Sequence, residues 1–247
     1  MNRYTAEEAL AQVHSGEYLH WPCVAGAPEH LIEALVARAA RGEIEDIHIH
    51  HLYTEGYADY VLPQYSGIFH LDSFFVGGNV RKATQQGLAG HIPCSLSESA
   101  RMVRNGTIRC DVGLLMVTPP DEEGKVSLGT SVDYMPAAIE RARLVIAQVN
   151  RHVPYTYGDA QLQTRQRGDE TVLVLKDGRE VPLLMVEHDT ELKEAAPLPL
   201  SETDRAIGRY AAELIPDGAT LQIGIGISFA RVSMIISWNI SVGAMRW

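Results

Sequence analysis

The chain has 247 residues, enough for one large domain or for one domain and part of a second. With 46% apolar and 21% charged residues it has a globular composition, and its net charge of −10 argues against nucleic acid as a partner, because nucleic-acid-binding surfaces are usually basic. Residues 1–18 lack the apolar core of a signal peptide, and no apolar run approaches the roughly 20 residues that span a bilayer. We therefore expect a cytoplasmic protein without a membrane partner.

Helical and strand patterns alternate along the first 150 residues. Helices are expected at 5–14, 27–42, 79–87, 96–106 and 133–143, and strands at 44–52, 111–117 and 144–150. This alternation predicts an α/β fold with an open, mostly parallel sheet sandwiched by helices. The strands at 111–117 and 144–149 are continuously apolar, as strands buried on both faces are, so we expect them to be neighbours in the core of the sheet.

The pattern changes after residue 164. Residues 165–189 look like short polar-edged strands around an Asp177-Gly178 turn, which predicts a hairpin. A proline-bearing polar linker follows, and Ser201 begins a capped helix that leads into a strand at 219–226. We therefore expect a first domain at 1–197 and the incomplete beginning of a second, similar domain at 198–247.

Two glycine-bearing segments are candidate ligand sites. The turn formed by Gly224, Ile225, Gly226, Ile227 and Ser228 lies where a strand hands over to a helix, so its backbone N–H groups are available to an anion. The loop 118–131 follows an apolar strand and should lie at the carboxyl edge of the sheet; its candidate cleft residues are Asp121, Gly124, Ser127, Gly129 and Ser131. Either segment taken alone is equally compatible with a tight turn or a plain surface loop.

The run His48–His51 invites a metal interpretation, because alternate histidines on a strand share one face. The other candidate ligands show no ligand-like spacing: His70, His91, His152 and His188, together with Cys23, Cys94 and Cys110. We therefore expect a polar strand end at 48–51, free thiols in a reducing cytoplasm and no bound metal. The sequence also lacks GxSxG, a phosphate-binding GxxxxGK[ST], HExxH and a nicotinamide fingerprint.

Three segments taken together are more informative. They are "FFVGGNVRKATQQGLAGHIPCSLSE" at 74–98, the run from "DVGLLMVTPPDEEGKVSLGTS" to "YGD" at 111–159, and "IPDGATLQIGIG" at 215–226. In this order they resemble the acetyl-CoA hydrolase/transferase family, and within it 4-hydroxybutyrate or acetate CoA-transferases. The resemblance implies two α/β domains with the active site between them, and CoA or acyl-CoA and a small carboxylate as substrates, with no permanently bound cofactor.

The same resemblance implies a mechanism. A glutamate of the second domain attacks the acyl thioester, and the released CoA thiolate then forms a glutamyl-CoA thioester, with ping-pong kinetics. The segment matching residues 224–228 contacts CoA in the family. Related enzymes commonly form dimers, which leaves a homodimer open.

The chain departs from this pattern after the glycine turn. The family places its glutamate about two dozen residues further on, in a stretch resembling G-[IV]-H-[ST]-E-M, whereas this sequence has "SFARVSMIISWNISVGAMRW" and no acidic residue after Glu213 except Asp217. We expect that the catalytic glutamate is absent and that the reading frame is truncated or shifted; a divergent paralogue is the alternative. Glu140 and Glu187 are expected to be solvated helix and hairpin charges rather than substitutes.

Several functions remain open. The first is the N-terminal portion of a CoA-transferase, inactive alone; the second is a non-catalytic acyl-CoA-binding or interaction module. An acetyl-CoA hydrolase and a metal-dependent hydrolase using His48 and His50 are further alternatives. The fold alone does not choose among them.

Overall fold

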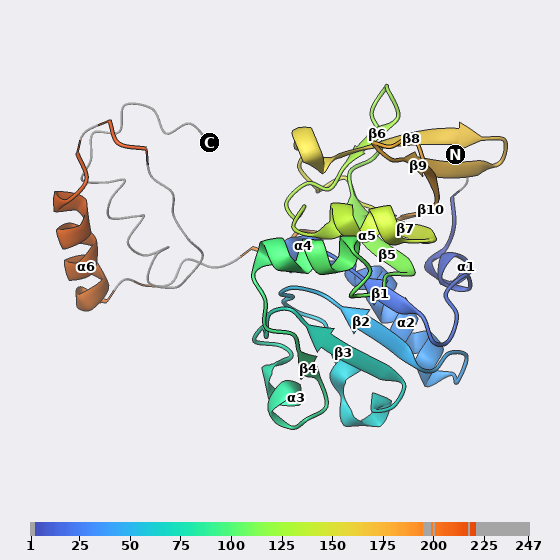
Figure 1. Ribbon diagram of the computed structural model, residues 1–247, viewed down its shortest axis with the longest axis horizontal. Helices are drawn as coiled ribbons and strands as arrows, with labels where there is room; N and C mark the ends of the chain where they lie inside the picture. Colours follow the sequence, from blue (N-terminus) through green and yellow to red (C-terminus); the bar gives the residue numbers. More distant parts are fainter. Residues whose placement is uncertain (1–2, 195–198, 200, 217, 221–247) are drawn as a thin grey trace. The chain divides into compact units, whose positions relative to one another are not determined.

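The computed structural model describes residues 3–194, 199, 201–216 and 218–220. The chain divides into two compact units, residues 1–193 and 194–247. The first unit is a large α/β body, and in the second the structure describes one helix and its flanking residues (Figure 1).

A single sheet runs through the first unit. Its strands are β1 (Tyr18–His20), β2 (Ile47–His50), β3 (Phe69–Ser73), β4 (Gly90–His91), β5 (Val112–Val117), β6 (Lys125–Ser127), β7 (Leu144–Val149), β8 (Gln161–Arg167), β9 (Glu170–Val174) and β10 (Glu180–Glu187). In the described part of the chain they lie in the order β4-β3-β2-β1-β5-β7-β10-β9-β8-β6. Pairing is parallel from β4 to β10 and antiparallel from β10 to β6, which confirms the expected open, mostly parallel α/β sheet.

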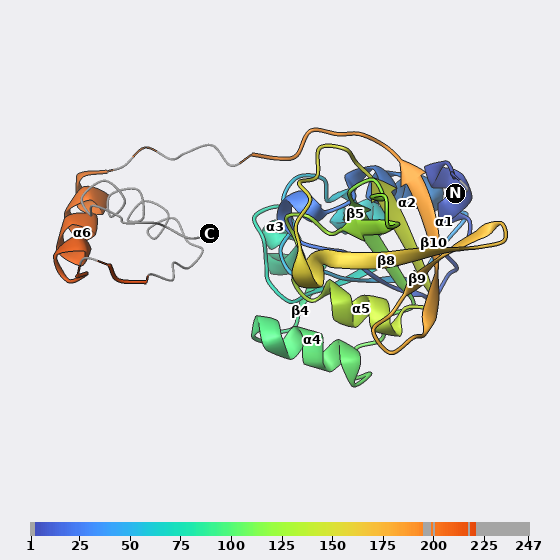
Figure 2. The same ribbon diagram turned by 90° about the horizontal axis from the view of Figure 1, so that it is seen from above.

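Helices cover both faces of this sheet. The α-helices are α1 (Ala6–Leu10), α2 (Glu29–Ala40), α3 (Arg81–Gln85), α4 (Leu96–Arg104), α5 (Met135–Arg141) and, in the second unit, α6 (Glu202–Glu213). Short 3₁₀ turns lie at Val24–Gly26, Asp59–Val61, Pro63–Tyr65 and Gly158–Ala160. Figure 2 shows α1 and α2 on one side of the sheet and α4 and α5 on the other.

The helix ends follow from local sequence. Thr5, Ser95 and Ser201 each form a capping box at the start of α1, α4 and α6, so two otherwise free backbone donors are satisfied at each end. Pro28 is the N-cap of α2, and Gly42 lies just past the end of this helix with φ +71°. Helix α3 is shorter than the expected 79–87.

The centre of the sheet is apolar on both faces. Strands β5 and β7 are fully buried and pair in parallel from Val112 opposite Leu144 to Val117 opposite Val149, which confirms the predicted pair of neighbours. Leu114 and Ile146 pack in the core beneath α1 and α2, whereas Leu115 and Val145 pack in the second core beneath α4 and α5. Burial from both sides explains why these strands carry no polar alternation.

The antiparallel part is larger than expected. The predicted hairpin is confirmed, since β9 and β10 pair in antiparallel fashion around the turn at Gly178, whose φ is +84°. Strand β6 lies inside the segment 118–131, which had been expected to be a loop throughout. Val126 and Leu128 are buried in the second core, so this stretch is tied to the sheet as an edge strand paired with β8.

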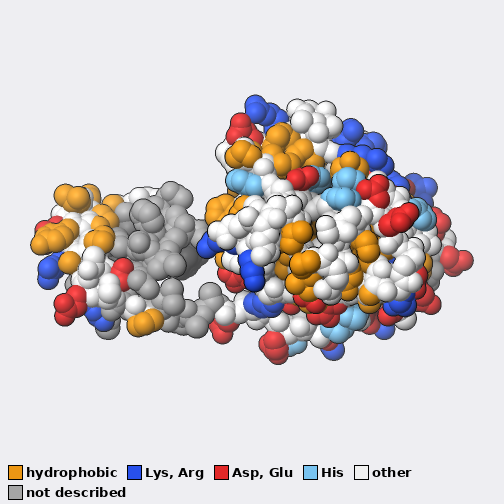
Figure 3. All heavy atoms as spheres, turned by 90° about the horizontal axis from the view of Figure 1, so that it is seen from below, with side chains coloured by type: hydrophobic (Ala, Val, Ile, Leu, Met, Phe, Trp, Pro, Cys, Tyr) orange, Lys and Arg blue, Asp and Glu red, His pale blue; other side chains and the backbone are white. Residues whose placement is uncertain are grey.

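In the second unit, α6 confirms the capped helix that Ser201 begins. The expected strand 219–226 falls almost entirely outside the described residues. Helix α6 exposes the apolar side chains of Ile207, Tyr210 and Leu214, and Figure 3 shows hydrophobic atoms at the surface of this unit.

Candidate functional site at the carboxyl ends of the parallel strands

The carboxyl ends of β5, β7 and β10 border a cavity of about 760 Å³, a typical size for a ligand pocket. Its lining consists of Arg3, Pro119, Pro120, Asp121, Val149, Arg151, Met185, Glu187, His188 and Asp189. Open α/β proteins bind ligands at this edge of the sheet, because the loops that follow parallel strands meet there. The loop 118–131 was predicted to lie at the carboxyl edge of the sheet, and its first residues, Pro119 to Asp121, do lie there.

The charges in this cavity are paired. Arg3 Nε lies 2.9 Å from Glu187 Oε1. The backbone N–H of Arg151 donates to Asp189 Oδ1 at 2.8 Å and its Nε donates to Oδ2 at 2.7 Å. The hydrogen bonds from Arg151 lower the pKa of the Asp189 carboxyl. Because each cation has a carboxylate beside it, the cavity presents a mixed polar rim over an apolar floor that includes Val149 and Met185.

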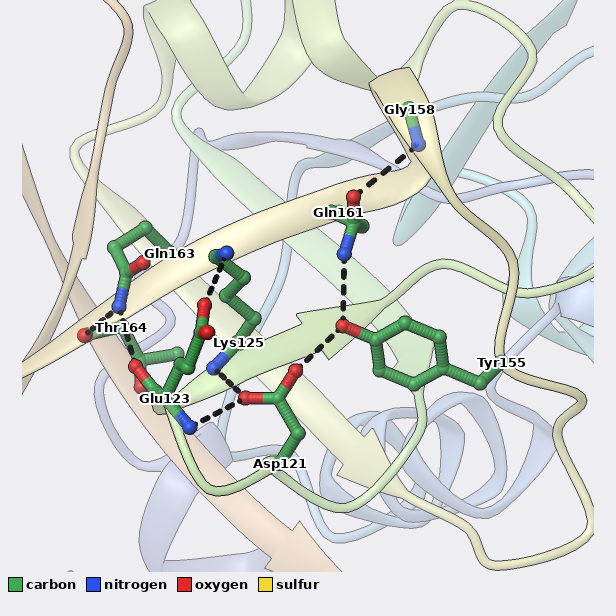
Figure 4. Close-up of polar contacts among 8 residues, drawn as sticks. All are labelled: Asp121, Glu123, Lys125, Tyr155, Gly158, Gln161, Gln163 and Thr164. Carbon is green, nitrogen blue, oxygen red and sulfur yellow. Dashed lines mark hydrogen bonds and ion pairs between the residues drawn. The ribbon is translucent and has the colours of Figure 1, made fainter.

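Asp121 borders a second cavity of about 480 Å³, lined by Asp121, Glu122, Glu123, Lys125, Tyr155, Tyr157 and Gln161. Figure 4 shows how its carboxylate organises the turn. Oδ1 accepts the backbone N–H groups of Glu123 (2.9 Å) and Lys125 (2.8 Å), and Oδ2 accepts the Tyr155 hydroxyl at 2.7 Å. The bond from Tyr155, together with these backbone donors, lowers the pKa of Asp121. Asp121 is thus an ionised group between two cavities.

The orientation of Tyr155 is fixed from its other side. Gln161 Nε2 donates to the Tyr155 hydroxyl oxygen at 2.9 Å, and Gln161 Oε1 accepts the backbone N–H of Gly158 at 3.3 Å (Figure 4). The bond to Asp121 raises the pKa of Tyr155. Tyr157, which is 79% exposed, meets the Tyr155 ring edge-on at 5.3 Å. No local sequence pattern places these two aromatic side chains beside Asp121, since they come from another loop.

The other predicted loop residues shape the backbone. Ser127 is fully buried; its hydroxyl accepts the N–H groups of Thr156 (3.0 Å) and Gly129 (3.1 Å) and donates to the Thr156 carbonyl. Gly129 has φ +62°, and a Cβ there would lie 2.1 Å from Val153 Cγ1. Gly124 has φ +74° and accepts the Thr164 N–H at its carbonyl. The structure places these residues in the framework of the loop, while their predicted role toward a ligand stays a prediction.

Ser131 belongs to a separate cluster after β1. Its hydroxyl donates to the Cys23 carbonyl at 2.8 Å, and the Cys23 N–H donates to Asp133 Oδ2 at 2.9 Å. Val24 and Asp133 have φ values of +47° and +34°, rare for residues with side chains, and such strain concentrates at functional sites. Burial raises the pKa of the Asp133 carboxyl, and burial together with Asp133 raises that of the Cys23 thiol to about 12, so this thiol is a poor nucleophile. Sequence reasoning missed Asp133, because only folding brings it to Cys23.

The histidine run is not the polar strand end that the sequence suggested. His50 and His51 are buried, and burial lowers the pKa of His51 to about 3. His51 Nε2 lies 3.1 Å from the Tyr60 hydroxyl, while His50 Nδ1 lies 3.1 Å from the Asp72 carbonyl. The cause is tertiary, since loops from other strands close over this end of β2. Among the residues that the structure describes, no group of three His, Cys, Asp or Glu side chains is arranged to hold a metal ion.

The two alternative glutamates lie in different surroundings. Glu140 is on α5 and accepts Arg104 Nε at 2.8 Å, as expected of a helix charge. Glu187 corrects our expectation: it is the last residue of β10, at the carboxyl edge, and lines the larger cavity. The reason is that the second hairpin strand continues into the sheet and runs parallel to β7 from Leu183 onward. The predicted CoA-binding turn 224–228 lies outside the described residues.

Comparison with known proteins decides the family. The sequence model described as "Acetyl-CoA hydrolase/transferase N-terminal domain" matches residues 2–187. The chain belongs to this family. The match covers nearly all of the first unit, including the second cavity and all of the first cavity's lining except His188 and Asp189. No described helix has the length and apolar character that a bilayer crossing requires.

Relatives within the acetyl-CoA hydrolase/transferase family are CoA-transferases. The chain is 38% identical over 203 residues to a succinyl-CoA:acetate/propanoyl-CoA:succinate CoA transferase of Fasciola hepatica, covering 82% of this chain and 39% of the relative. It is 32% identical to a 4-hydroxybutyrate coenzyme A transferase of Clostridium kluyveri, covering 90% and 48%. The crystal structure of RipA from Yersinia pestis has the same fold, with TM-score 0.76, 26% identity and coverage of 94% and 52%. The chain thus spans half or less of the length of these curated relatives.

Proposed function

We propose that the chain supplies the N-terminal domain of a CoA-transferase that moves CoA between an acyl-CoA and a small carboxylate. The observation that carries this proposal is the family match across 2–187, a unit whose carboxyl edge forms two cavities. Relatives named for transfer between CoA thioesters and carboxylates support the reaction class.

The finer proposal is a substrate of the 4-hydroxybutyrate or acetate type and a glutamyl-CoA thioester intermediate. Support comes from the sequence resemblance, in which the turn 224–228 contacts CoA through a helix N-terminus and a second-domain glutamate is the nucleophile. CoA acts as a substrate here, not as a resident cofactor.

We further propose that the 247-residue polypeptide does not turn over by itself. Carboxylate catalysis needs a carboxylate held within bonding reach of the thioester carbonyl, and the sequence has no glutamate after Glu213. Glu187 lines the larger cavity at the carboxyl edge, but it is paired with Arg3 at 2.9 Å and half-exposed. We assign it to the wall of the cavity.

The test is incubation of the polypeptide with acetyl-CoA and either acetate or 4-hydroxybutyrate, followed by trapping with borohydride or hydroxylamine and mass spectrometry. We expect no turnover and no adduct, with weak CoA binding by calorimetry. A trapped glutamate in wild type that is lost in Glu187→Gln would overturn the assignment of Glu187. Release of free CoA without an acceptor would indicate an acetyl-CoA hydrolase, and tight CoA binding without chemistry would favour a binding module.

A further inference from the structure

Two histidines from distant parts of the first unit lie face to face. His30 is the second residue of α2, and His188 directly follows β10. Their ring centroids are 3.8 Å apart, their planes differ by 6°, and both residues are part-buried. Two imidazole rings stack stably at this distance while no more than one carries a proton, since two positive charges so close repel each other. The stack is therefore a contact whose strength depends on pH.

This stack fastens one end of the segment that leaves the sheet. We call residues 188–193 the exit segment, because it leads from β10 out of the first unit. Its other end is also held on the first turn of α2, where Lys193 Nζ pairs with Glu29 Oε1. The exit segment thus contacts the same helix end through His188 at its start and through Lys193 at its finish.

The middle of the exit segment is held just past the end of β7. Asn150 Nδ2 donates to the Thr190 carbonyl at 2.8 Å, and Asn150 Oδ1 accepts the Thr190 N–H at 3.3 Å. Arg151 donates to Asp189 and keeps the pKa of that carboxyl low, so this pair stays charged where histidines titrate. His188 and Asp189 also line the larger cavity, so the start of the exit segment is part of the cavity wall.

Charges around the stacked pair set the direction of its response. Burial, and after it the facing His188, lowers the pKa of His30. The carboxylates of Glu33 on α2 and Glu7 on α1 oppose this shift without cancelling it. The neutral pair is therefore favoured above the ordinary histidine pKa of about 6.5, and the contact weakens as the pH falls below that value.

The other charges on and beside the exit segment have partners. They are Lys193 with Glu29, Asp189 with Arg151, Glu191 with His152 at 3.6 Å and, at the end of β10, Glu187 with Arg3. Protonation of His152 strengthens its contact with Glu191, so this histidine acts in the opposite sense. Weakening in acid is therefore specific to His30 and His188.

We propose that the stacked pair His30 and His188 is an acid-sensitive clasp, which fastens the exit segment to α2 at neutral pH and releases it in acid. Once the stack is lost, the exposed Lys193–Glu29 pair holds the segment on α2, and exposed ion pairs contribute little. Release loosens the wall of the larger cavity at His188. The clasp adds a pH-dependent device to the fold and does not rest on the proposed function.

The experiment follows the two rings and the neighbouring amides by NMR of the 247-residue polypeptide between about pH 8 and about pH 5. Near pH 8 the ring protons of His30 and His188 should each be shifted by the facing ring, and this shift should vanish in acid. The His188 N–H donates to the Val149 carbonyl at 3.0 Å, and the Thr190 N–H donates to Asn150. Hydrogen-exchange protection factors of both amides should fall about tenfold over this range.

Two variants assign the response. His188→Phe keeps a flat ring against His30 but cannot be protonated, so protection should become independent of pH and the pKa of His30 should rise. His152→Gln removes the other histidine contact of the exit segment and should leave the acid response unchanged.

Three results would overturn the proposal. They are rings that do not shift each other near pH 8, an acid response that survives in His188→Phe, and an equal loss of protection at the Ile146 amide in the core strand β7. The last would mean that the whole first unit opens rather than the clasp. None of these outcomes bears on the CoA-transferase function.

Discussion

Strands β5 and β1 are neighbours in one parallel sheet, yet they have opposite surface chemistry. Strand β5 buries six consecutive residues, with apolar side chains on both faces beneath helices. Strand β1 buries Leu19 in the core beneath α1 and α2, but its other face carries the ring side chains of Tyr18, which is part-exposed, and His20, which is buried. The difference teaches that helix cover, not strand type, sets which side chains a parallel strand can carry. Where cover ends, stacked polar rings replace aliphatic packing.

The largest test of this contrast compares one residue from each region. Ile146→Ala removes a fully buried side chain from β7 and should lower the free energy of unfolding by about 2–5 kcal/mol. His48→Ala, in the stack that His48 forms with Tyr18, should lower it by less than about 1 kcal/mol, since its ring is part-exposed. Urea unfolding monitored by circular dichroism measures both. Equal losses would show that the stack of Tyr18 and His48 is as well packed as the core.

The buried histidines predict acid lability at the covered end of β1 and β2. Burial lowers the pKa of both His20 and His51 from 6.5 to about 3, so the unfolded chain takes up these protons first. Their neutral forms are favourable above pH 6.5, and stability falls as pH drops from 6.5 toward 3, by up to about 1.4 kcal/mol per pH unit for each. Unfolding free energies across this window should have a shallower slope in His51→Phe. The exposed-site variant His91→Gln serves as control, and an unchanged slope in His51→Phe would contradict the assignment.

Gly129 and Gly168 have similar backbone φ values but different surroundings. Substituting each one therefore separates the cost of a steric clash from the cost of an unfavourable backbone conformation. Gly129, in the loop at the carboxyl edge, has φ +62° and a neighbour 2.1 Å from the site of a Cβ, whereas Gly168 has φ +59° with nothing within 4 Å. Gly168→Ala should cost about 1 kcal/mol for the backbone alone, and Gly129→Ala about 2–3 kcal/mol or more. Thermal and urea unfolding compare them. Equal costs would mean that Val153 moves aside freely and that the loop is less tightly framed than described.

The smallest effect expected is a local one at the Asp121 turn. Tyr155→Phe removes the hydroxyl that donates to Asp121 at 2.7 Å, the first cause of that carboxyl's lowered pKa. The pKa of Asp121 should therefore rise toward its ordinary value, while the fold stays intact. NMR titration of the Asp121 carboxyl measures this, with Tyr157→Phe as the neighbouring control. An unmoved pKa would assign the shift to the backbone donors of Glu123 and Lys125.

Much of the fold could be predicted from short-range pattern. Continuous apolar runs identified β5 and β7 as central neighbours, and Asp177-Gly178 identified the hairpin turn, because burial and turn geometry impose residue types locally. The strand β6 was missed, since only three residues of the segment 118–131 pair with β8. The position of Glu187 at the carboxyl edge of the sheet was also missed. A strand that pairs antiparallel at its start and parallel at its end has no local sequence signal.

The candidate site divides in the same way. The sequence by itself determined the family, the central strands β5 and β7 and the carboxyl-edge position of Asp121, since each rests on motifs or on continuous apolar runs, whereas the short strands β1, β3 and β4 were missed. Only the tertiary structure decided that Tyr155 meets Asp121, that Asp133 holds Cys23, and that the histidines of β2 divide into buried and stacked groups. The physical reason is distance along the chain: Asp133 and Cys23 are separated by 110 residues, and a hydrogen bond of that span has no local sequence signal.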